Sequence, residues 1–438
     1  MSEPIGIALL GAGTVGSGVA NLLHQERELL RRRVGAELKI VAVCDKKFPN
    51  ADALPESLKG AHLHKELHDA IKDHKVKIVI ELIGGKTVAR EAVLAAIAAG
   101  KPTVTANKAL LATHAEEIFG LAESRSAPIG FEASVAGGIP VLRAIREGLS
   151  GDRILSVRGI INGTSNYILS EMTDKGEGFS GVLKKAQQAG YAEADPTFDV
   201  EGVDAAHKLA LLASMCFGTH VPFDQIYTEG ITKITAEDIA HAKSFGYRIK
   251  LLGIARLQDG EMELRVHPVM IREETLLAKI SGALNGVAVE GAHTGVTHYT
   301  GWGAGGDPTA GAIVSDLVAI ARYLMSGGTL APARILKEAN LARIPVRPVS
   351  KIESAYYLRF SVRDRPGVLA KLAGHLGSAG VSIAQIHQPL RSEAEGVPVI
   401  VLTHRTREEL VQKALPVVAK EDFLTAATVL VRVEDERL

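Results

Sequence analysis

Residues 5–16 read IGIALLGAGTVG, and this stretch decides the fold of the first part of the chain. Six apolar residues predict a buried strand, and the glycines after it match G-x-G-x-x-G where a strand turns into a helix. In such a turn Gly11 allows the tight bend, Gly13 lets a pyrophosphate approach the backbone, and Gly16 allows close helix packing. The helix N-terminus adds amide donors for phosphate. The candidate phosphate-binding residues are Gly11, Gly13, Thr14, Val15 and Gly16.

The same alternation of elements continues through the first 131 residues. Further apolar runs lie at residues 38–45, 77–84 and 101–107, and helical patterns lie at residues 15–30 and 87–99. Strands alternating with helices predict βαβ units and a parallel sheet. Residues 1–131 are therefore expected to form an α/β domain with a doubly wound Rossmann sheet that binds NAD(P).

The second predicted strand ends in Asp45, Lys46 and Lys47. An acidic side chain there accepts hydrogen bonds from the ribose hydroxyl of NAD(H), whereas a cation suits the 2′-phosphate of NADP(H). Asp45 and Lys46 are both candidate cofactor residues, and the choice between the two cofactors stays open.

Two further domains are expected after residue 131. Residues 132–345 mix helical and strand patterns and predict an α+β domain for catalysis and dimerisation, whose helix at 309–325 packs back on the first domain. A proline-containing linker at 343–355 follows. Residues 355–433 then show the order βαββαβ of a ferredoxin-like domain. Within it, strands are expected at 356–362, 381–388, 397–403 and 425–433, and helices at 366–379 and 406–418.

Composition excludes several functional classes. The 50 Lys and Arg residues balance the 50 Asp and Glu residues, so the basic excess of a nucleic-acid or membrane-surface protein is missing. Cys44 and Cys216 lie in apolar runs and form neither a disulfide framework nor a C-x-x-C site. The N-terminal residues lack a signal-peptide pattern, and the apolar runs are shorter than a membrane span. A cytoplasmic protein is expected.

An acidic stretch is the most informative part of the second domain. Five carboxylates lie between Glu193 and Asp204, just before an apolar helix. Pro196 disfavours helix at the preceding residue, which places Glu193 on a loop. Asp204 and Lys208 are four positions apart and share a helix face. An acidic loop with one surface ion pair is the alternative, but unpaired charges on an apolar helix would be costly. A calcium loop is disfavoured because its ligand spacing is absent.

Lys108 follows the strand predicted at residues 101–107. Ligands of a doubly wound sheet bind beyond the carboxyl ends of its strands, where a catalytic cation would be useful. By itself this position fits an ordinary lysine at the start of a helix better.

Several motifs between residues 11 and 310 resemble homoserine dehydrogenase. They are GAGTVG, TANKAL, EASVAGGIP, NGTSNY, GYAEADPTFDVEGVDAAHK and GWGAGGDPTA, in this order. The stretch from Gly190 to Lys208 resembles the family signature and is the most specific. The resemblance implies reversible reduction of L-aspartate 4-semialdehyde to L-homoserine with NADPH or NADH, a step in the biosynthesis of threonine, methionine and isoleucine.

The resemblance also implies residue roles. The lysines at the reacting oxygen would be Lys208 and Lys108, and Asp204 would support catalysis. The substrate-binding residues would be Glu193, Asp199, Asp204, Thr164 and Tyr191. Further cofactor contacts would be Lys108, Gly190, Glu193, Gly303 and Gly305. A monovalent cation, Na⁺ or K⁺, would be held by Glu132, Val135, Gly137 and Ile139. Ala136 stands where the family commonly has glycine.

Residues 356–433 resemble an ACT domain. Asp364, Gly367 and Val368 match the loop that binds an amino-acid effector in that family. ACT domains pair with one another, which implies a homodimer or a tetramer. Feedback inhibition by L-threonine is the expectation, and a dimerisation domain with an empty site is the alternative.

Two rival functions are less consistent with the sequence. An aspartate-semialdehyde dehydrogenase needs a cysteine nucleophile, and neither Cys44 nor Cys216 has a suitable base beside it. A non-catalytic sensor of nucleotide and amino acid would not need Glu193, Asp204 and two lysines together.

Overall fold

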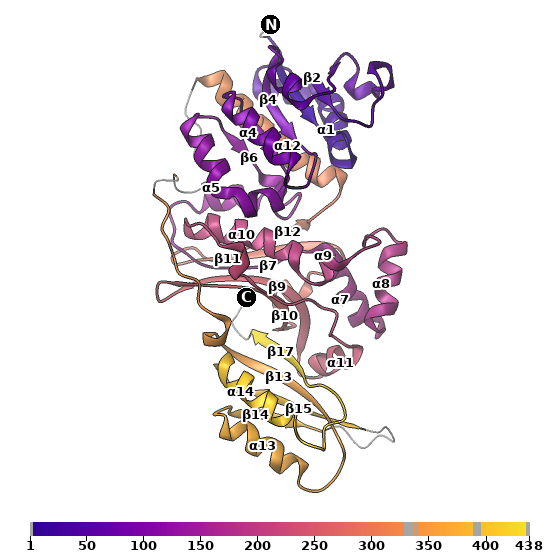
Figure 1. Ribbon diagram of the computed structural model, residues 1–438, viewed down its shortest axis with the longest axis vertical. Coiled ribbons are helices and arrows are strands. Elements are labelled where there is room, and N and C mark those ends of the chain that lie inside the picture. The colour runs from indigo at the N-terminus through magenta and orange to yellow at the C-terminus, as the bar shows by residue number, and fades with distance from the viewer. Residues whose placement is uncertain (1–2, 328–336, 338–339, 389–395, 435–438) are drawn as a thin grey trace. The chain divides into compact units, whose positions relative to one another are not determined.

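The chain folds into two compact units, each assembled from separate segments. The computed structural model describes residues 3–327, 337, 340–388 and 396–434 (Figure 1). The first unit comprises residues 1–157, 207–224 and 284–343, and the second comprises 158–206, 225–283 and 344–438.

The first unit contains the predicted parallel sheet. Its strands are β1 (Ile5–Leu10), β2 (Leu38–Cys44), β3 (His62–Leu63), β4 (Val76–Glu81), β5 (Thr103–Thr105) and β6 (Ile129–Gly130). They lie in the order β3-β2-β1-β4-β5-β6, and all neighbours are parallel. Continuous burial of β1 explains its apolar sequence, because helices cover both faces of such a sheet. The expected Rossmann fold is confirmed.

The helices of this sheet differ from the prediction in one place. They are α1 (Thr14–Gln25), α2 (Arg27–Val34), α3 (Leu67–Lys72), α4 (Val88–Ala98) and α5 (Lys108–Ser124). The single helix expected at 15–30 is wrong. Glu26 has a ψ of 19°, which ends the first helix and starts a second one.

The helix α12 (Gly306–Ser326) belongs to the core of the first unit. Ala310, Ile313 and Leu317 recur at helical spacing and share a buried cluster with Ile7 of β1 and Val19 of α1. Among the described residues, α12 is long and apolar enough to span a membrane by length and composition. Its apolar face is instead covered by the core cluster.

The first unit also contains a β-hairpin. The strands β11 (Leu284–Gly291) and β12 (Gly295–Trp302) are antiparallel, and Leu284 pairs with Trp302. The motif GWGAGGDPTA at 301–310 therefore begins inside a strand, because cross-strand pairing extends β12 to Trp302.

The second unit is built on a long hairpin. The strands β9 (Tyr247–Gln258) and β10 (Glu261–Arg272) pair along their whole length. Asp259 and Gly260 join them with φ values of 54° and 77°, the combination that a tight I′ turn requires. The helices of this unit include α7 (Gly163–Lys175), α8 (Phe179–Gln188), α9 (Thr197–Val200) and α11 (Ala236–Ser244). The strand β7 (Ile154–Ile160) and the helix α10 (Val203–Phe217) each run from one unit into the other.

The C-terminal part of the second unit has the expected βαββαβ order. Its elements are β13 (Glu353–Val362), α13 (Val368–Ser378), β14 (Ile383–His387), β15 (Val397–Thr403), α14 (Glu408–Val418) and β17 (Val429–Glu434). The strand order β17-β13-β15-β14 is antiparallel throughout. The two helices pack on one face around Tyr356, Phe360 and Phe423, which confirms the ferredoxin-like architecture.

This C-terminal sheet is joined to the hairpin of the same unit. The strand β17 pairs with β13 on one side and, in parallel, with β10 on the other. Arg432 of β17 donates two hydrogen bonds to Glu408 at 2.6 and 2.8 Å in a buried pair. The expected linker also lies against β10: the N–H of Met262 donates to Pro345 at 2.8 Å, and the N–H of Arg347 donates to Met262 at 2.7 Å. Residues 345–347 of the linker are therefore held by backbone pairing at the edge of β10.

Candidate active site

The glycine turn at the end of β1 has the geometry of a phosphate site. Gly11 has a φ of +92°, and a Cβ there would lie 2.6 Å from the Leu82 carbonyl oxygen. A Cβ on Gly16 would lie 2.2 Å from the Gly11 carbonyl oxygen. A Cβ on Gly13 would meet nothing within 4 Å, so the space above the first turn of α1 is open. Gly13 caps α1 without a side-chain hydrogen bond, and the amides of the first turn remain available to an anion.

A second helix N-terminus lies beside this turn. A Cβ on Gly306, the first residue of α12, would lie 3.6 Å from the Thr14 methyl group. Gly305 caps α12 with a φ of +120° and no side-chain hydrogen bond. Gly303 is pressed against Asn285, where a Cβ would lie 2.0 Å from the side-chain amide carbon. Gly305 is thus the N-cap of a helix, whereas Gly303 lies so close to Asn285 that a larger residue would not fit there.

Asp45 closes the glycine turn. Its carboxylate accepts the N–H of Ala12 at 2.5 Å and the N–H of Lys47 at 2.7 Å. Among the described residues each oxygen therefore accepts one hydrogen bond, and it keeps further acceptor capacity. Lys46 is exposed next to it. The structural role of Asp45 was not predicted, because the partner amide is 33 residues away in the sequence.

Lys108 begins α5 at the carboxyl end of β5. Asn107 caps this helix by accepting the N–H of Leu110 at 3.1 Å, and its side chain donates to the Gly85 carbonyl oxygen at 2.6 Å. The loop that carries Lys108 is therefore held in place at the edge where a doubly wound sheet binds ligands.

In the second unit, the acidic stretch is organised by Asn162. Its side-chain amide donates to Asp199 at 2.8 Å and to Asp204 at 2.8 Å. The side-chain carbonyl oxygen of Asn162 accepts the N–H of Ser165 at 2.8 Å and so caps α7. Asn162 and Asp204 are both buried. Sequence reasoning missed this residue, although an asparagine directly before a helical pattern is a recognisable N-cap signal.

Other predicted site residues lie in or next to the loop between α8 and α9. The Thr164 hydroxyl donates to the Tyr191 carbonyl oxygen at 2.8 Å. The Tyr191 ring stacks on Tyr167 with centroids 4.4 Å apart. Gly190 has a φ of +78° and open space where a Cβ would lie. Glu193 is solvent-exposed, and its backbone oxygen accepts a hydrogen bond from Gln187 at 3.0 Å. The structure thus brings Thr164 and Tyr191 into contact and leaves the Glu193 side chain at the surface.

The helix α10 carries Asp204 in its first turn and Lys208 one turn later. Their side chains leave the same face of the helix. Asp204 is 4% exposed and Lys208 is 8% exposed, so both charges are almost fully removed from water. Burial of charged groups is costly unless polar partners accompany them, and the Asn162 amide is such a partner for Asp204.

The segment expected to hold a monovalent cation contains a buried carboxylate. Glu132 accepts the N–H groups of Leu142 and Arg143 at 2.9 Å each. Its own N–H donates to Asp316 at 2.9 Å, and the Arg143 guanidinium lies 3.0 Å from Asp316. Burial and, next, the neighbouring Asp316 charge raise the pKa of Glu132 to about 7. Two buried carboxylates thus lie together, with the Arg143 guanidinium beside both and Arg146 close enough to act on Asp316.

The backbone next to Glu132 turns sharply. Ala136 and Gly137 have φ values of 55° and 52°, and a Cβ on Gly137 would lie 2.5 Å from the Gly303 carbonyl oxygen. Val135 and Ile139 are buried. The Ile139 carbonyl oxygen already accepts the N–H of Val141 at 2.8 Å, which leaves it one lone pair for another ligand.

The expected effector loop borders a pocket of about 440 Å³. The loop runs from β13 into α13, and Gly367 caps this helix with a φ of +89° and no side-chain hydrogen bond. Asp364 is exposed at the pocket, and Val368 is buried in the core below. The other lining residues include Gln388 and Val399.

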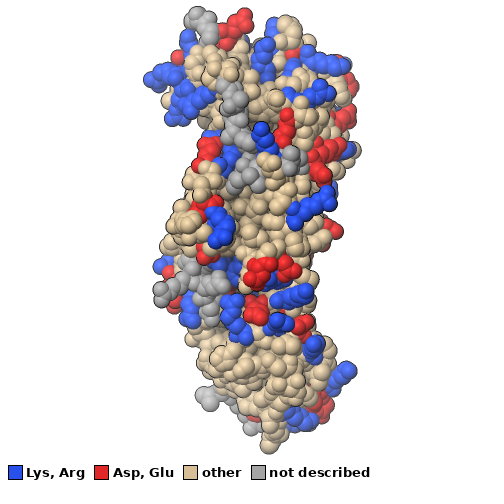
Figure 2. Space-filling view, turned by 90° about the vertical axis from the view of Figure 1, so that its left-hand side faces the viewer, with Lys and Arg blue, Asp and Glu red and all other residues tan. Residues whose placement is uncertain are grey.

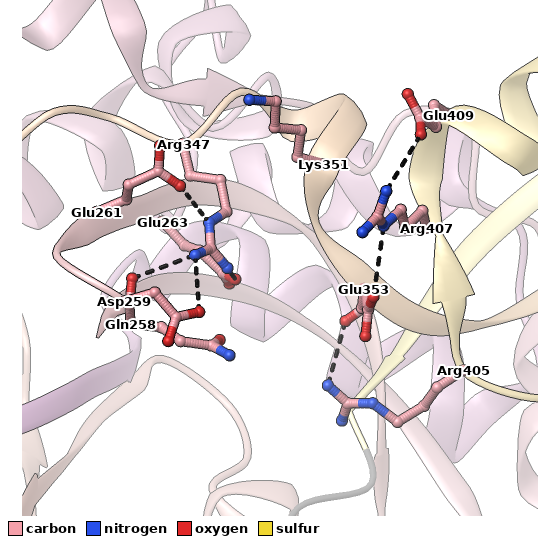
Figure 3. Close-up of a pocket in the computed structure, with 10 residues that line it drawn as sticks. All are labelled: Gln258, Asp259, Glu261, Glu263, Arg347, Lys351, Glu353, Arg405, Arg407 and Glu409. Carbon is pink, nitrogen blue, oxygen red and sulfur yellow. Dashed lines mark hydrogen bonds and ion pairs between the residues drawn. The ribbon is translucent and has the colours of Figure 1, made fainter.

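A second pocket of about 440 Å³ lies elsewhere in the second unit (Figure 3). Its lining residues are Gln258, Asp259, Glu261, Glu263, Arg347, Lys351, Glu353, Arg405, Arg407 and Glu409. Arg347 pairs with Glu261 at 2.9 Å, and Arg407 pairs with Glu353 at 3.6 Å. None of the predicted site residues lines this pocket, and its charges largely neutralise one another.

The surface charges and the two cysteines bear on the functional classes that the composition disfavoured. On the face shown in Figure 2, basic and acidic side chains are interspersed over the described residues. Cys44 and Cys216 are buried free thiols, and burial raises the pKa of both. A raised thiol pKa disfavours the nucleophilic thiolate.

Comparison with known proteins gives matches along nearly the whole chain. Family models match as "Homoserine dehydrogenase, NAD binding domain" at residues 11–132, "Homoserine dehydrogenase" at 140–318 and "ACT domain" at 356–420. A homoserine dehydrogenase of Pseudomonas aeruginosa is 45% identical over 435 residues, and one of Neisseria gonorrhoeae is 44% identical over 434 residues; each alignment covers 99% of both chains. The crystal structure of a homoserine dehydrogenase from Thiobacillus denitrificans has a TM-score of 0.92 and 45% identity, covering 99% of this chain and 98% of that one.

Proposed function

The chain belongs to the homoserine dehydrogenase family and is an NAD(P)-dependent enzyme with a C-terminal ACT domain, and from that premise we propose how its residues reduce L-aspartate 4-semialdehyde to L-homoserine. The observation that carries the proposal is the pair of carboxylates, Asp199 and Asp204, held by Asn162. Such a pair suits a substrate that bears an ammonium group and, after reduction, a hydroxyl.

The lysines act on the reacting oxygen. When bound, the nicotinamide cofactor supplies the hydride that reaches the aldehyde carbon. Negative charge then develops on the aldehyde oxygen, and an ammonium group beside it stabilises that charge and delivers a proton. We assign this role to Lys208, with Lys108 as the second cation. In the reverse direction the same lysine accepts the hydroxyl proton.

The carboxylates position the substrate. The bonds to Asn162 use one oxygen of Asp199 and one of Asp204, and they hold both groups in a defined orientation. Asp199, Asp204 and the exposed Glu193 then bind the substrate's ammonium group or hydroxyl, or orient the lysines. Thr164 and Tyr191, which contact each other, would line the substrate site.

The cofactor is assigned to the two uncapped helix starts. The turn from Gly11 to Gly16 and the cap at Gly305 offer backbone amides to the pyrophosphate. Asp45 has acceptor capacity left for a ribose hydroxyl, and the exposed Lys46 suits a 2′-phosphate. Both NAD(H) and NADP(H) are therefore compatible with this site. The additional contacts proposed from the family motifs are Gly303, Lys108, Gly190 and Glu193.

A monovalent cation, Na⁺ or K⁺, is assigned to Glu132 and the backbone carbonyl groups of Val135, Gly137 and Ile139. The support is the pair of buried carboxylates at Glu132 and Asp316, which hold the pKa of Glu132 above its ordinary value although Arg143 lies beside them. Bound there, the cation would hold the turn at residues 135–139 and the start of the following helix in one geometry.

The ACT domain is proposed to bind L-threonine and to inhibit turnover. Asp364, Gly367 and Val368 border a pocket at an uncapped helix start, which suits the carboxylate of an amino acid. A homodimer or tetramer in the cytoplasm is part of the same proposal. The proposed domain bounds are 1–131, 132–345 and 355–433.

One assay tests the catalytic and regulatory parts together. NADPH and NADH oxidation is followed with L-aspartate 4-semialdehyde, with and without millimolar L-threonine, in buffer containing sodium or potassium. Turnover that threonine suppresses supports both parts. Turnover that is unchanged by threonine excludes threonine as the effector. Absence of turnover with both cofactors, in folded protein, contradicts the catalytic assignment.

A further inference from the structure

Three potential metal ligands meet at one edge of the sheet in the first unit. His62 and His64 lie at and just after β3, the edge strand beside β2. Asp73 follows the short helix α3. One ligand atom from each of these three residues lies within 4.8 Å of the other two.

The separations match those between ligands of a single ion. His64 Nε2 lies 3.5 Å from Asp73 Oδ2, and His62 Nδ1 lies 3.9 Å from the same oxygen. In a tetrahedral zinc site with bonds of about 2.1 Å, neighbouring ligand atoms are about 3.4 Å apart. His74 Nδ1 lies 3.6 Å from Asp73 Oδ1 and is exposed, so it can approach as a fourth ligand.

Burial distinguishes this cluster from a group of surface histidines. The side chains of His64 and Asp73 are only 10% and 11% exposed. His64 Nε2 is buried and makes no hydrogen bond of good geometry among the described residues, although Asp73 Oδ2 lies 3.5 Å away. Nε2 can face the Asp73 carboxylate either as a proton donor or as a metal ligand. His62, in contrast, is 69% exposed, which leaves an entry path from solvent.

The carboxylate is held in position from behind. Asp73 Oδ1 accepts the N–H of Lys75 at 2.9 Å, and the Asp73 carbonyl oxygen accepts the Lys101 ammonium at 3.0 Å. Outer hydrogen bonds of this kind orient metal-binding carboxylates. Oδ2 is the oxygen that faces both histidines.

We propose that His62, His64 and Asp73 form a binding site for a divalent transition metal of the zinc class. Two imidazole nitrogens and one carboxylate are the ligands that zinc prefers, whereas magnesium and calcium prefer oxygen alone. The metal clamps the edge strand to the turn after α3. Because β3 pairs with β2 at Ala42 and Val43, the clamp also stabilises the strand that leads to Asp45. This site is independent of the proposed substrate and effector roles.

The test is metal binding by the full-length protein. Chelator-treated protein is titrated calorimetrically with Zn²⁺, and the visible absorption of Co²⁺ reports tetrahedral coordination by nitrogen and oxygen. We expect one Zn²⁺ per chain at this site, a tetrahedral Co²⁺ spectrum, and a thermal midpoint several degrees higher with Zn²⁺ in excess. His62→Gln and His64→Gln should remove all three signals. The matched control is His68→Gln, an exposed histidine near the cluster that pairs with Glu91 instead.

Two results would overturn the proposal. One is Zn²⁺ affinity and stoichiometry in His62→Gln that equal those of the wild type. The other is a wild-type chain that binds neither metal, in which case a proton on His64 satisfies the carboxylate. If His64→Gln does not fold, the exposed His62→Gln variant and Asp73→Asn decide the question, because loss of binding in both is expected.

Discussion

Replacing Asn162 with serine separates two functions of one side chain. The asparagine amide donates to Asp199 and Asp204 at 2.8 Å each, and its carbonyl oxygen caps α7 by accepting the N–H of Ser165. Serine caps a helix about as well as asparagine but is too short to reach both carboxylates. The variant therefore removes the bridge and retains the cap.

The magnitude follows from burial. A hydrogen bond to a charged group contributes about 1.5 to 3 kcal/mol, and the larger value applies to the nearly buried Asp204. Asp199 is partly exposed, so water replaces part of its lost bond. Asn162→Ser should lower the free energy of unfolding by about 2 to 4 kcal/mol. Asn162→Ala should cost about 1 kcal/mol more, because the cap is lost as well.

The assay combines urea unfolding with steady-state kinetics. kcat/KM for L-aspartate 4-semialdehyde should fall at least tenfold in Asn162→Ser, while the Kd for NADPH stays within twofold, since the glycine turn is untouched. A change in unfolding free energy below about 0.5 kcal/mol, the range of ordinary surface substitutions, would refute the reasoning. Equal stability of the serine and alanine variants would refute the capping part alone.

Three further predictions concern the catalytic, cation and effector sites. Lys208→Ala should reduce kcat by at least a hundredfold with NADPH binding retained in a fluorescence titration; wild-type turnover would contradict its role. The pKa of Glu132 is about 7 in the folded chain, above the ordinary 4.5, so stability is lost as pH rises from 4.5 to 7, by roughly 3 kcal/mol in total. The thermal midpoint of Glu132→Gln should not fall over this pH range. Added Na⁺ or K⁺ should raise the thermal midpoint of the wild type more at pH 8 than at pH 6. An equal rise at both pH values would argue against the cation site. Asp364→Asn should raise the threonine concentration for half inhibition about tenfold at unchanged uninhibited kcat, and unchanged sensitivity in an inhibitable wild type would exclude Asp364.

The sequence by itself was enough to predict the features that depend only on residues close together in the chain. The run from Ile5 to Gly16 specifies a buried strand, a tight turn and a helix start, because burial and backbone conformation are set within a dozen residues. The βαββαβ order of the C-terminal part was predictable for the same reason. Local patterns were weaker at Glu26, where one non-helical ψ value divides a continuous helical pattern.

The tertiary structure decided which distant groups meet. Asn162 reaches carboxylates 37 and 42 positions away, Asp45 reaches an amide 33 positions away, and Glu132 meets Asp316 across 184 positions. The pairing of β17 with both β10 and β13 is equally invisible in the sequence. Periodicity reports which face of an element is buried, but the partner on that face depends on the chain topology. The residue types needed for chemistry were therefore readable from the sequence, whereas the hydrogen bonds that hold them in place required the fold.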